Sequence, residues 1–331
     1  MTNGYKIISE YQRRQQIGRI ASEPSGTSKG LITSASCSSA LIDDELRPIF
    51  VRAISSALMY GVEVDATLDI PKASLEYYQQ LRIASIREAQ LSFHELRNQA
   101  ILLIRNLSRR LIDENEKPLK PEEFAEQAHV LLCQRTWFAA LETYRQTYHL
   151  SDADELVVSG LITHYHAIHI LVACAHETQQ TLFDDHLQSF REVLKHAKLI
   201  LDSMDLTTDQ PTARFTFEIS LIPVVFVVAT RCRCPSTRRE AMDLLARKPP
   251  REGLFDAEQH VVVTRRVIEI EEEELDPRTG WPVERTRLWS SVIDANMDCN
   301  GGFWAYFVPS CSVHEKTSDG KQKLRQEFFV L

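Results

Sequence analysis

Two cysteines, two residues apart, have the types and spacing that could do chemistry. Cys232 and Cys234 lie in ATRCRCPSTRREAMDLLARKPPREG, residues 229–253, where basic side chains crowd the same span. A zinc site takes four ligands in a tetrahedron, usually as two close pairs from separate loops. No second Cys or His pair follows within the roughly 12 to 20 residues that small zinc modules use, and His260 is alone. We therefore predict that both thiols are structural and bind no metal.

A run of histidines offers a second set of candidate ligands. In HYHAIHILVACAH, helical spacing would place His166, His169 and His176 on one face, yet no carboxylate sits at matching spacing. The run is otherwise apolar. Packed or capped core histidines are therefore favoured over a metal site.

Motifs for other chemistry are incomplete. Asp184 and Asp185 lack the third acid and the facing acidic motif of a terpene cyclase, so a cap at a helix start is favoured. FHELRN ends in Asn98 where a His-Glu-x-x-His site has its second histidine. No Gly-rich phosphate loop or Gly-x-Ser-x-Gly elbow is present. The sequence predicts no enzyme and no cofactor.

A helix, a corner and a second helix explain the basic stretch without a metal. We predict a buried apolar helix over about residues 213–233, kinked by Pro223. Arg231 and Arg233 would lie at its C-terminal end, where their charge opposes the negative end of the helix dipole. Pro235 cannot continue that helix and suits the turn or the start of the next one.

The second helix of the corner is predicted over about residues 236–247. Leu244 and Leu245 are expected to pack inward, with at least one of them in the core. Arg238 and Arg239 are expected to face solvent or a neighbouring acid, which would leave them at the surface or in an ion pair.

A further helix, over about residues 256–275, ends in the acidic run Glu271 to Glu274. We interpret this run as a solvated helix face tied to Arg265 and Arg266 one turn earlier. An acidic activation surface is the alternative.

Helix periodicity dominates the chain upstream of the corner. The predicted helices cover about residues 43–60, 72–112, 121–144, 151–177 and 183–204. The second of these is one long helix or two joined near Ser92, and Ser151 begins the fourth in a capping-box-like arrangement with Asp154. Aromatic and β-branched runs around Asp319-Gly320 predict a C-terminal two-stranded hairpin.

These elements predict an all-α fold: a helical bundle or short α-solenoid of about nine or ten helices with a small C-terminal β-hairpin. The predicted organisation is a disordered segment over residues 1–38, a helical domain over 39–299 and the hairpin over 300–331. The first segment is rich in Ser, Gly and Thr, which cannot bury enough apolar surface to offset chain entropy.

Composition limits the class of protein. The 331 residues carry a net charge of −8, which makes the whole domain a poor non-specific binder of duplex DNA. Seven scattered cysteines indicate reduced thiols in an intracellular protein. No apolar run approaches the roughly 20 residues that span a bilayer, and the N-terminus does not resemble a signal peptide. We expect no membrane partner.

The stretch FTFEISLIPVVFVVATRCRCPSTRREAMDLLARKPPREGLFDAEQHVVVTRRVIEIEEEE resembles the fungal-specific transcription factor domain. This domain is the helical region C-terminal to the zinc cluster in fungal six-cysteine transcription regulators. The resemblance is specific over residues 212–290 and follows only the order of helices over 40–211. It rests on Glu218, Pro223, Arg231, Cys232, Arg233, Arg238, Arg239, Glu240, Ala241, Arg251, Glu252 and Gly253, with Glu269 to Glu274 and Trp289.

One departure from the family concerns zinc. The family's cluster has six cysteines within roughly 30 residues near the N-terminus, whereas only Cys37 lies in the first hundred residues here. Zinc would belong only to that absent cluster. We therefore expect a separated or truncated regulatory half, a gene model without its first exon, or a free-standing relative. Direct DNA binding by this chain alone is not expected.

The resemblance implies a nuclear, non-catalytic regulatory domain. It would act through contacts with protein partners of the transcription machinery or with a homodimer partner, and it allows a small effector in an interhelical cavity. A helical enzyme or small-molecule carrier from a fungal metabolic gene cluster, in secondary metabolism, is the alternative from another class. A metal-dependent acid constellation in a cavity would favour that alternative.

Overall fold

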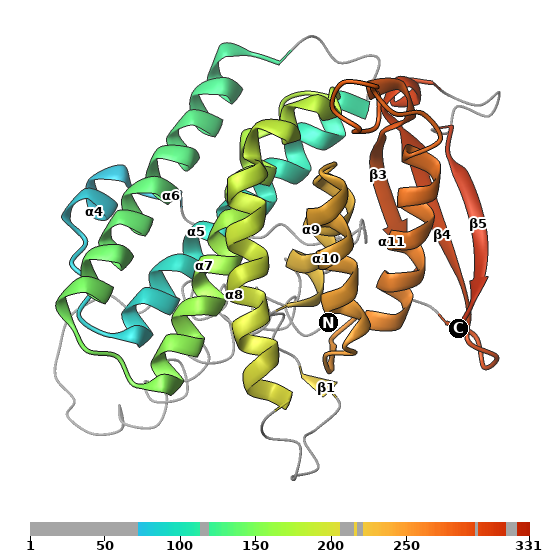
Figure 1. Cartoon of the computed structure of the whole chain (residues 1–331). Coiled ribbons are helices and arrows are strands. Elements are labelled where there is room, and N and C mark those ends of the chain that lie inside the picture. The colour runs from blue at the N-terminus through green and yellow to red at the C-terminus, as the bar shows by residue number, and fades with distance from the viewer. Residues whose placement is uncertain (1–71, 113–118, 206–214, 217–220, 295–296, 316–322) are drawn as a thin grey trace, which may run out of the picture. The chain divides into compact units, whose positions relative to one another are not determined.

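The fold is known from a computed structural model, which describes residues 72–112, 119–205, 215–216, 221–294, 297–315 and 323–331. All of them belong to one compact unit, Pro71–Leu331 (Figure 1). The described part is mostly helical, with eight α-helices, three short 3-10 helices and a small C-terminal antiparallel sheet. The predicted helical class is confirmed; the eight α-helices counted among the described residues differ slightly in number from the nine or ten predicted for the whole chain. The segment over residues 1–38 and the helix over 43–60 lie outside the described residues.

Long helices form the first half of the described chain. They are α4 (Leu75–Gln80), α5 (Ile86–Ile112), α6 (Pro121–Thr147), α7 (Asp152–Ala173) and α8 (Leu187–Asp205). The long predicted helix is divided in two, but the break follows Gln80 and Ser92 lies inside α5. The cap at Ser151 is confirmed, because its Oγ accepts the N–H of Asp154 at 3.2 Å.

An aromatic cluster holds α5, α6 and α7 together. Trp137 is fully buried, and its ring centroid lies 4.6 Å from that of Phe93. Its Nε1 donates to Ser92 Oγ at 3.0 Å, which satisfies the one polar atom of the indole. The ring of Phe138 stacks on that of Tyr165, with 4.1 Å between the ring centroids. The long helices are therefore held together by packing with few unsatisfied polar groups in this cluster.

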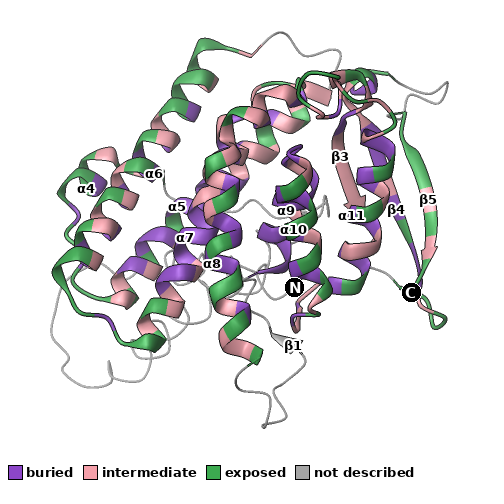
Figure 2. Cartoon of the chain, in the orientation of Figure 1, coloured by how far each residue is buried: buried purple, intermediate pink, exposed green. Residues whose placement is uncertain are grey.

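Helix α7 corrects the prediction that no apolar segment of the chain approaches the length that spans a bilayer. By length and composition it could span a membrane, with a mean hydropathy of 1.6 over its most apolar window. It packs against α5, α6, α8 and α9, and 56% of that window is buried within the protein (Figure 2). These are properties of a core helix, which is buried on several sides and therefore apolar around most of its circumference.

Three shorter helices form the corner: α9 (Ile222–Arg231), α10 (Pro235–Ala246) and α11 (Ala257–Glu271). The predicted helix over 213–233 is wrong at its start. Pro223 lies in the first turn of α9 and kinks nothing, because that turn needs no N–H from proline. Before it, β1 (Phe215–Thr216) pairs in parallel with β2 (Arg251–Glu252).

The C-terminal sheet has three strands where a two-stranded hairpin was predicted. The antiparallel strands β3 (Leu288–Ile293), β4 (Gly302–Pro309) and β5 (Arg325–Val330) lie in the order β3-β4-β5. Trp289 lies in β3, which also packs against α11. The predicted turn at Asp319-Gly320 is outside the described residues.

Candidate functional site

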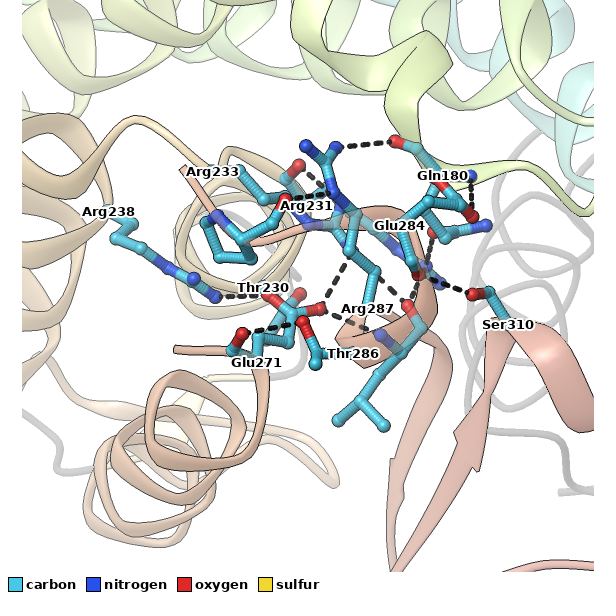
Figure 3. Close-up of polar contacts among 12 residues, drawn as sticks. Gln180, Thr230, Arg231, Arg233, Arg238, Glu271, Glu284, Thr286, Arg287 and Ser310 are labelled. Carbon is cyan, nitrogen blue, oxygen red and sulfur yellow. Dashed lines mark hydrogen bonds and ion pairs between the residues drawn. The ribbon is translucent and has the colours of Figure 1, made fainter. Parts of the chain in front are cut away.

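The arginines of the corner converge on one buried carboxylate (Figure 3). Arg233 donates from Nη2 to Glu271 Oε1 at 2.8 Å, and Arg238 donates from Nη2 to Glu271 Oε2 at 2.8 Å. All three side chains have no exposed surface. Of the two alternatives predicted for Arg238, the surface or an ion pair, the structure shows the ion pair, and it is buried. The prediction of a solvated Glu271 was wrong.

Backbone groups complete the shell of this Arg–Glu–Arg cluster. The N–H of Leu288 donates to Glu271 Oε1 at 2.9 Å, and Arg233 Nη2 also reaches the Leu288 carbonyl at 3.2 Å. Burial alone would raise the pKa of Glu271, but the two arginines and the Leu288 N–H lower it. The carboxylate is therefore ionised, and it joins the ends of α9, α10 and α11 to the start of β3.

Helical phase is the signal that could have located the cluster. Arg238 shares a face of α10 with Ala241 and Leu245, at spacings of three and seven residues, and both are buried. Glu271 likewise follows the buried Val267 and Ile268 by four and three residues on α11. Each charge continues an apolar stripe, which favours a buried pair over a solvated one.

Arg231 extends the cluster towards the 3-10 helix η2 (Gln180–His186). Its Nη1 donates to Gln180 Oε1 at 2.7 Å, and its guanidinium lies 5.3 Å from the centroid of the Phe183 ring. Burial, with repulsion from Arg233 as the next cause, lowers the pKa of Arg231 to about 10. The side chain remains charged at neutral pH.

A second ion pair fixes η2 to the segment before β3. Arg287 donates two parallel hydrogen bonds to Asp184, at 2.7 and 2.8 Å, in the bidentate geometry favoured by guanidinium groups. Glu284 accepts the backbone N–H groups of Gln180 and Thr181 at 2.8 to 3.0 Å. Asp184 is thus an ion-pair partner of a distant arginine, where the sequence favoured a helix cap.

Glu252 has a role that the sequence did not indicate. Its carboxylate is buried and accepts the N–H groups of Leu221 and Ile222 at 2.9 and 3.0 Å, which caps the start of α9. Beside it in β2 lies the half-buried Arg251, and Gly253 adopts a φ of +60° in the turn that follows. This left-handed conformation explains the glycine.

The remaining motif residues lie at or near the surface. Arg239 forms an exposed pair with Glu272 at 2.6 Å, and Glu240 is exposed. Arg266 pairs with Glu269 and Glu327, and not with the acidic run that the sequence assigned to it. Glu218 is outside the described residues.

The two corner cysteines occupy different electrostatic environments. Cys234 is the N-cap residue of α10, with its Sγ 3.4 Å from Ser236 Oγ. Burial would raise its pKa, but hydrogen bonds from Ser236 and Thr237 lower it to about 7. Burial raises the pKa of Cys232 to about 11. Within the described ranges, no three His, Cys, Asp or Glu side chains are grouped to hold a metal.

We expect Cys234→Ser to change the melting temperature little, because serine is a favoured N-cap residue and keeps a hydrogen-bonding group beside Ser236. Native mass spectrometry should show no stoichiometric zinc in either form. Cys133→Ser, in the aromatic core, serves as the contrasting variant. Zinc that is present in the wild-type protein and lost in Cys234→Ser would show that the corner binds metal.

The histidines of α7, and His176 in the turn after it, contact protein groups. His169 Nδ1 lies 3.0 Å from Gln134 Oε1, and His176 Nδ1 lies 2.9 Å from Gln127 Nε2. His166 meets the Phe138 ring edge-on at 5.5 Å. Burial lowers the pKa of both His166 and His169 to about 4, so these rings are neutral at physiological pH.

An open hollow of about 410 Å³ lies on α4 and α5, where Tyr77, Glu88, Leu91 and Glu95 are among its lining residues. Burial is the main cause that raises the pKa of Glu95. None of the corner arginines lines it, so any ligand of this hollow would bind away from the buried cluster.

Comparison with known proteins gives a partial similarity. No family model matches the chain, and no solved structure matches it. The chain is similar to a fungal transcription regulator, the aspercryptin biosynthesis cluster-specific transcription regulator atnN of Emericella nidulans. The two are 30% identical over 91 residues, which are 28% of this chain and 14% of the regulator. This similarity supports a relationship to fungal transcription regulators, while the particular domain family is not confirmed by a family model.

Proposed function

We propose that this chain is a non-catalytic regulatory part of a fungal transcription regulator and acts in the nucleus through contacts with other proteins. The observation that carries the proposal is the 30% identity over 91 residues to a cluster-specific regulator. Control of a fungal secondary-metabolism gene cluster is part of the same proposal, since the relative's name describes such a role for that protein.

The geometry of the corner supports a scaffold role for its basic residues. Arg233 and Arg238 are committed to Glu271, and Arg287 to Asp184. Phosphate contacts need accessible cations, which these buried side chains do not supply. These buried arginines are therefore better suited to stabilising the fold than to reading DNA.

Two arms of one experiment test the proposal. In a gel-shift titration at about 150 mM salt, the chain alone should bind duplex DNA only weakly, with a dissociation constant of about 10⁻⁴ M or poorer. Fused to an unrelated DNA-binding domain in a fungal host, the same chain should change transcription from a reporter that carries that domain's site.

The control for both arms is the fusion without this chain, measured at equal protein level. Sub-micromolar, sequence-dependent binding by the chain alone would contradict the assignment of DNA recognition to another polypeptide segment. A reporter output equal to that of the control, from a fusion shown to be folded and nuclear, would contradict the regulatory role itself.

A small effector remains part of the proposal. The hollow on α4 and α5 is the first place to search, because two carboxylates, Glu88 and Glu95, and one arginine, Arg87, on its lining offer polar groups to a small molecule that carries an amine. Substitution of both carboxylates by glutamine should then abolish any effector response of the reporter while leaving its basal output unchanged.

A further inference from the structure

The last strand of the sheet presents an edge. Among the described residues, β5 pairs with β4 alone, and it is the strand at the right in Figure 1. The opposite edge, β3, carries a register shift between Leu288 and Ser290 and packs against α11. Natural proteins protect sheet edges with prolines, bulges, lysines or other charged residues; Arg325–Val330 has no proline, bulge or lysine, and its charged residues are Arg325 and Glu327. The β5 edge is therefore suited to strand addition.

One hydrogen bond shows which residues of β5 direct their backbone N–H and C=O groups towards β4 and which direct them away from it. The N–H of Leu331 donates to Gly301 O at 3.2 Å, so this residue directs its backbone groups towards β4. In an antiparallel ladder these directions alternate along the strand. Leu324, Gln326, Phe328 and Val330 therefore direct their N–H and C=O groups towards the edge that β4 does not occupy.

The same alternate residues carry exposed apolar side chains. Phe328 is 49% exposed, Leu324 is 41% exposed, and the ring of Trp304 on β4 lies 5.2 Å from that of Phe328. Figure 2 shows β5 as largely exposed. On the other face, Glu327 pairs with Arg266 of α11 and with Arg325 of the same strand. The strand thus combines a backbone edge with apolar groups that gain from being covered.

We propose that two copies of this chain associate by antiparallel pairing of β5 with β5, which joins two three-stranded sheets into one of six strands. The twofold axis passes through Gln326, where the two copies exchange backbone hydrogen bonds. Arg325 then opposes Glu327 of the second copy, and the reverse pair forms by symmetry. Both Arg325–Glu327 pairs occupy non-hydrogen-bonded sites of the ladder, where side chains on neighbouring strands approach most closely. Leu324 opposes Phe328 of the second copy on the outer face.

Charge selects this register over its neighbours. An axis through Glu327 would place this carboxylate against its own copy, and directly opposed like charges are destabilising. An axis through Phe328 would set Glu327 against Phe329 and leave Arg325 opposite Leu331. Only the axis at Gln326 gives two complementary ion pairs among these three registers, so a second copy of the strand is a fitting partner.

Sedimentation velocity of the full chain, from about 1 to 100 µM, tests the association, because a weak symmetric dimer assembles across this range. The wild-type protein should convert reversibly from monomer to dimer. Gln326→Pro should be monomeric throughout, because proline removes the N–H on the axis while the ladder to β4 does not use it. Circular dichroism of this variant should match the wild type.

Charge exchange tests the register. Arg325→Glu and Glu327→Arg should each raise the dimer dissociation constant about tenfold or more, because each places two like pairs across the axis. An equimolar mixture of these two variants should form a heterodimer, since an acidic strand then faces a basic one. Arg278→Glu, at a side chain that is 89% exposed, makes the same change of charge away from β5 and should leave the dimer intact.

Three outcomes would overturn the proposal. These are a wild-type chain that stays monomeric to about 100 µM, a dimer that persists in folded Gln326→Pro, and a dimer insensitive to Arg325→Glu. Glu327→Arg also removes the ion pair with Arg266, and Arg325→Glu removes the ion pair with Glu327 of its own strand, so Gln326→Pro decides the matter if either charge variant does not fold. The measurements need no DNA or reporter, so they remain independent of the regulatory role.

Discussion

Glu271→Ala is expected to lower the free energy of unfolding by about 3 to 5 kcal/mol. The variant would leave the guanidinium groups of Arg233 and Arg238 buried without a negative partner, and the N–H of Leu288 without its acceptor. Such an uncompensated charge is costly because little water reaches it. Urea melts followed by circular dichroism would measure the change.

Glu272→Ala is the matched control, one residue further along the chain. Glu272 forms its close pair with the partly exposed Arg239 and reaches the buried Arg238 only at 3.9 Å, so its removal should cost about 0 to 1 kcal/mol. The surface positions that the sequence allowed for Arg238 and Arg239 would make the Arg238→Ala and Arg239→Ala double variant nearly harmless. The structure reverses that expectation, since Arg238 is buried against Glu271. Equal losses in Glu271→Ala and Glu272→Ala would contradict a dry, buried cluster.

The second large effect concerns the leucines of α10. Leu244 and Leu245 are both buried, as the sequence predicted. Leu245→Ala should cost about 2 to 5 kcal/mol, from the lost transfer free energy and the cavity left behind, and the double variant should cost more. Asp243→Ala, at an exposed position on the same helix, should change stability by about 0.5 kcal/mol or less.

The leucine experiment separates packing from charge at the corner. Denaturant midpoints of Leu245→Ala and Asp243→Ala, measured at an unchanged slope, report stability directly. If the leucine variant melted with the wild type, α10 would contribute little to the core. The buried arginines would then have to hold the corner together without apolar packing.

Local features of the fold could be predicted from the sequence. The cap at Ser151, the helix that begins at Pro121 and the helix–corner–helix around Pro235 each depend on residues within one or two turns. The break after Gln80 was missed in position because no Gly or Pro marks it. Strand β3 was missed because LWSSVI is short and alternates only weakly, and because the turn signal Asn300-Gly301, which precedes β4, was not connected with it.

The long-range contacts of the site could not be predicted in the same way. Arg238 and Glu271 are 33 residues apart, and Arg287 and Asp184 are 103 apart. Periodicity shows which face of a helix is buried, but it does not show which charges meet when two faces come together. The acidic run around Glu271 was interpreted as solvated because neighbouring Arg265 and Arg266 offered local partners.

The wide sequence separation of the Asp184–Arg287 pair has a kinetic consequence. Closing a loop of this length costs chain entropy before the ion pair can form, so contacts of this kind are expected to appear late in folding. Interactions absent from the transition state act mainly on the rate at which the native state opens. The Asp184–Arg287 contact between η2 and the segment before β3 would therefore affect the unfolding rate of the chain more than its folding rate.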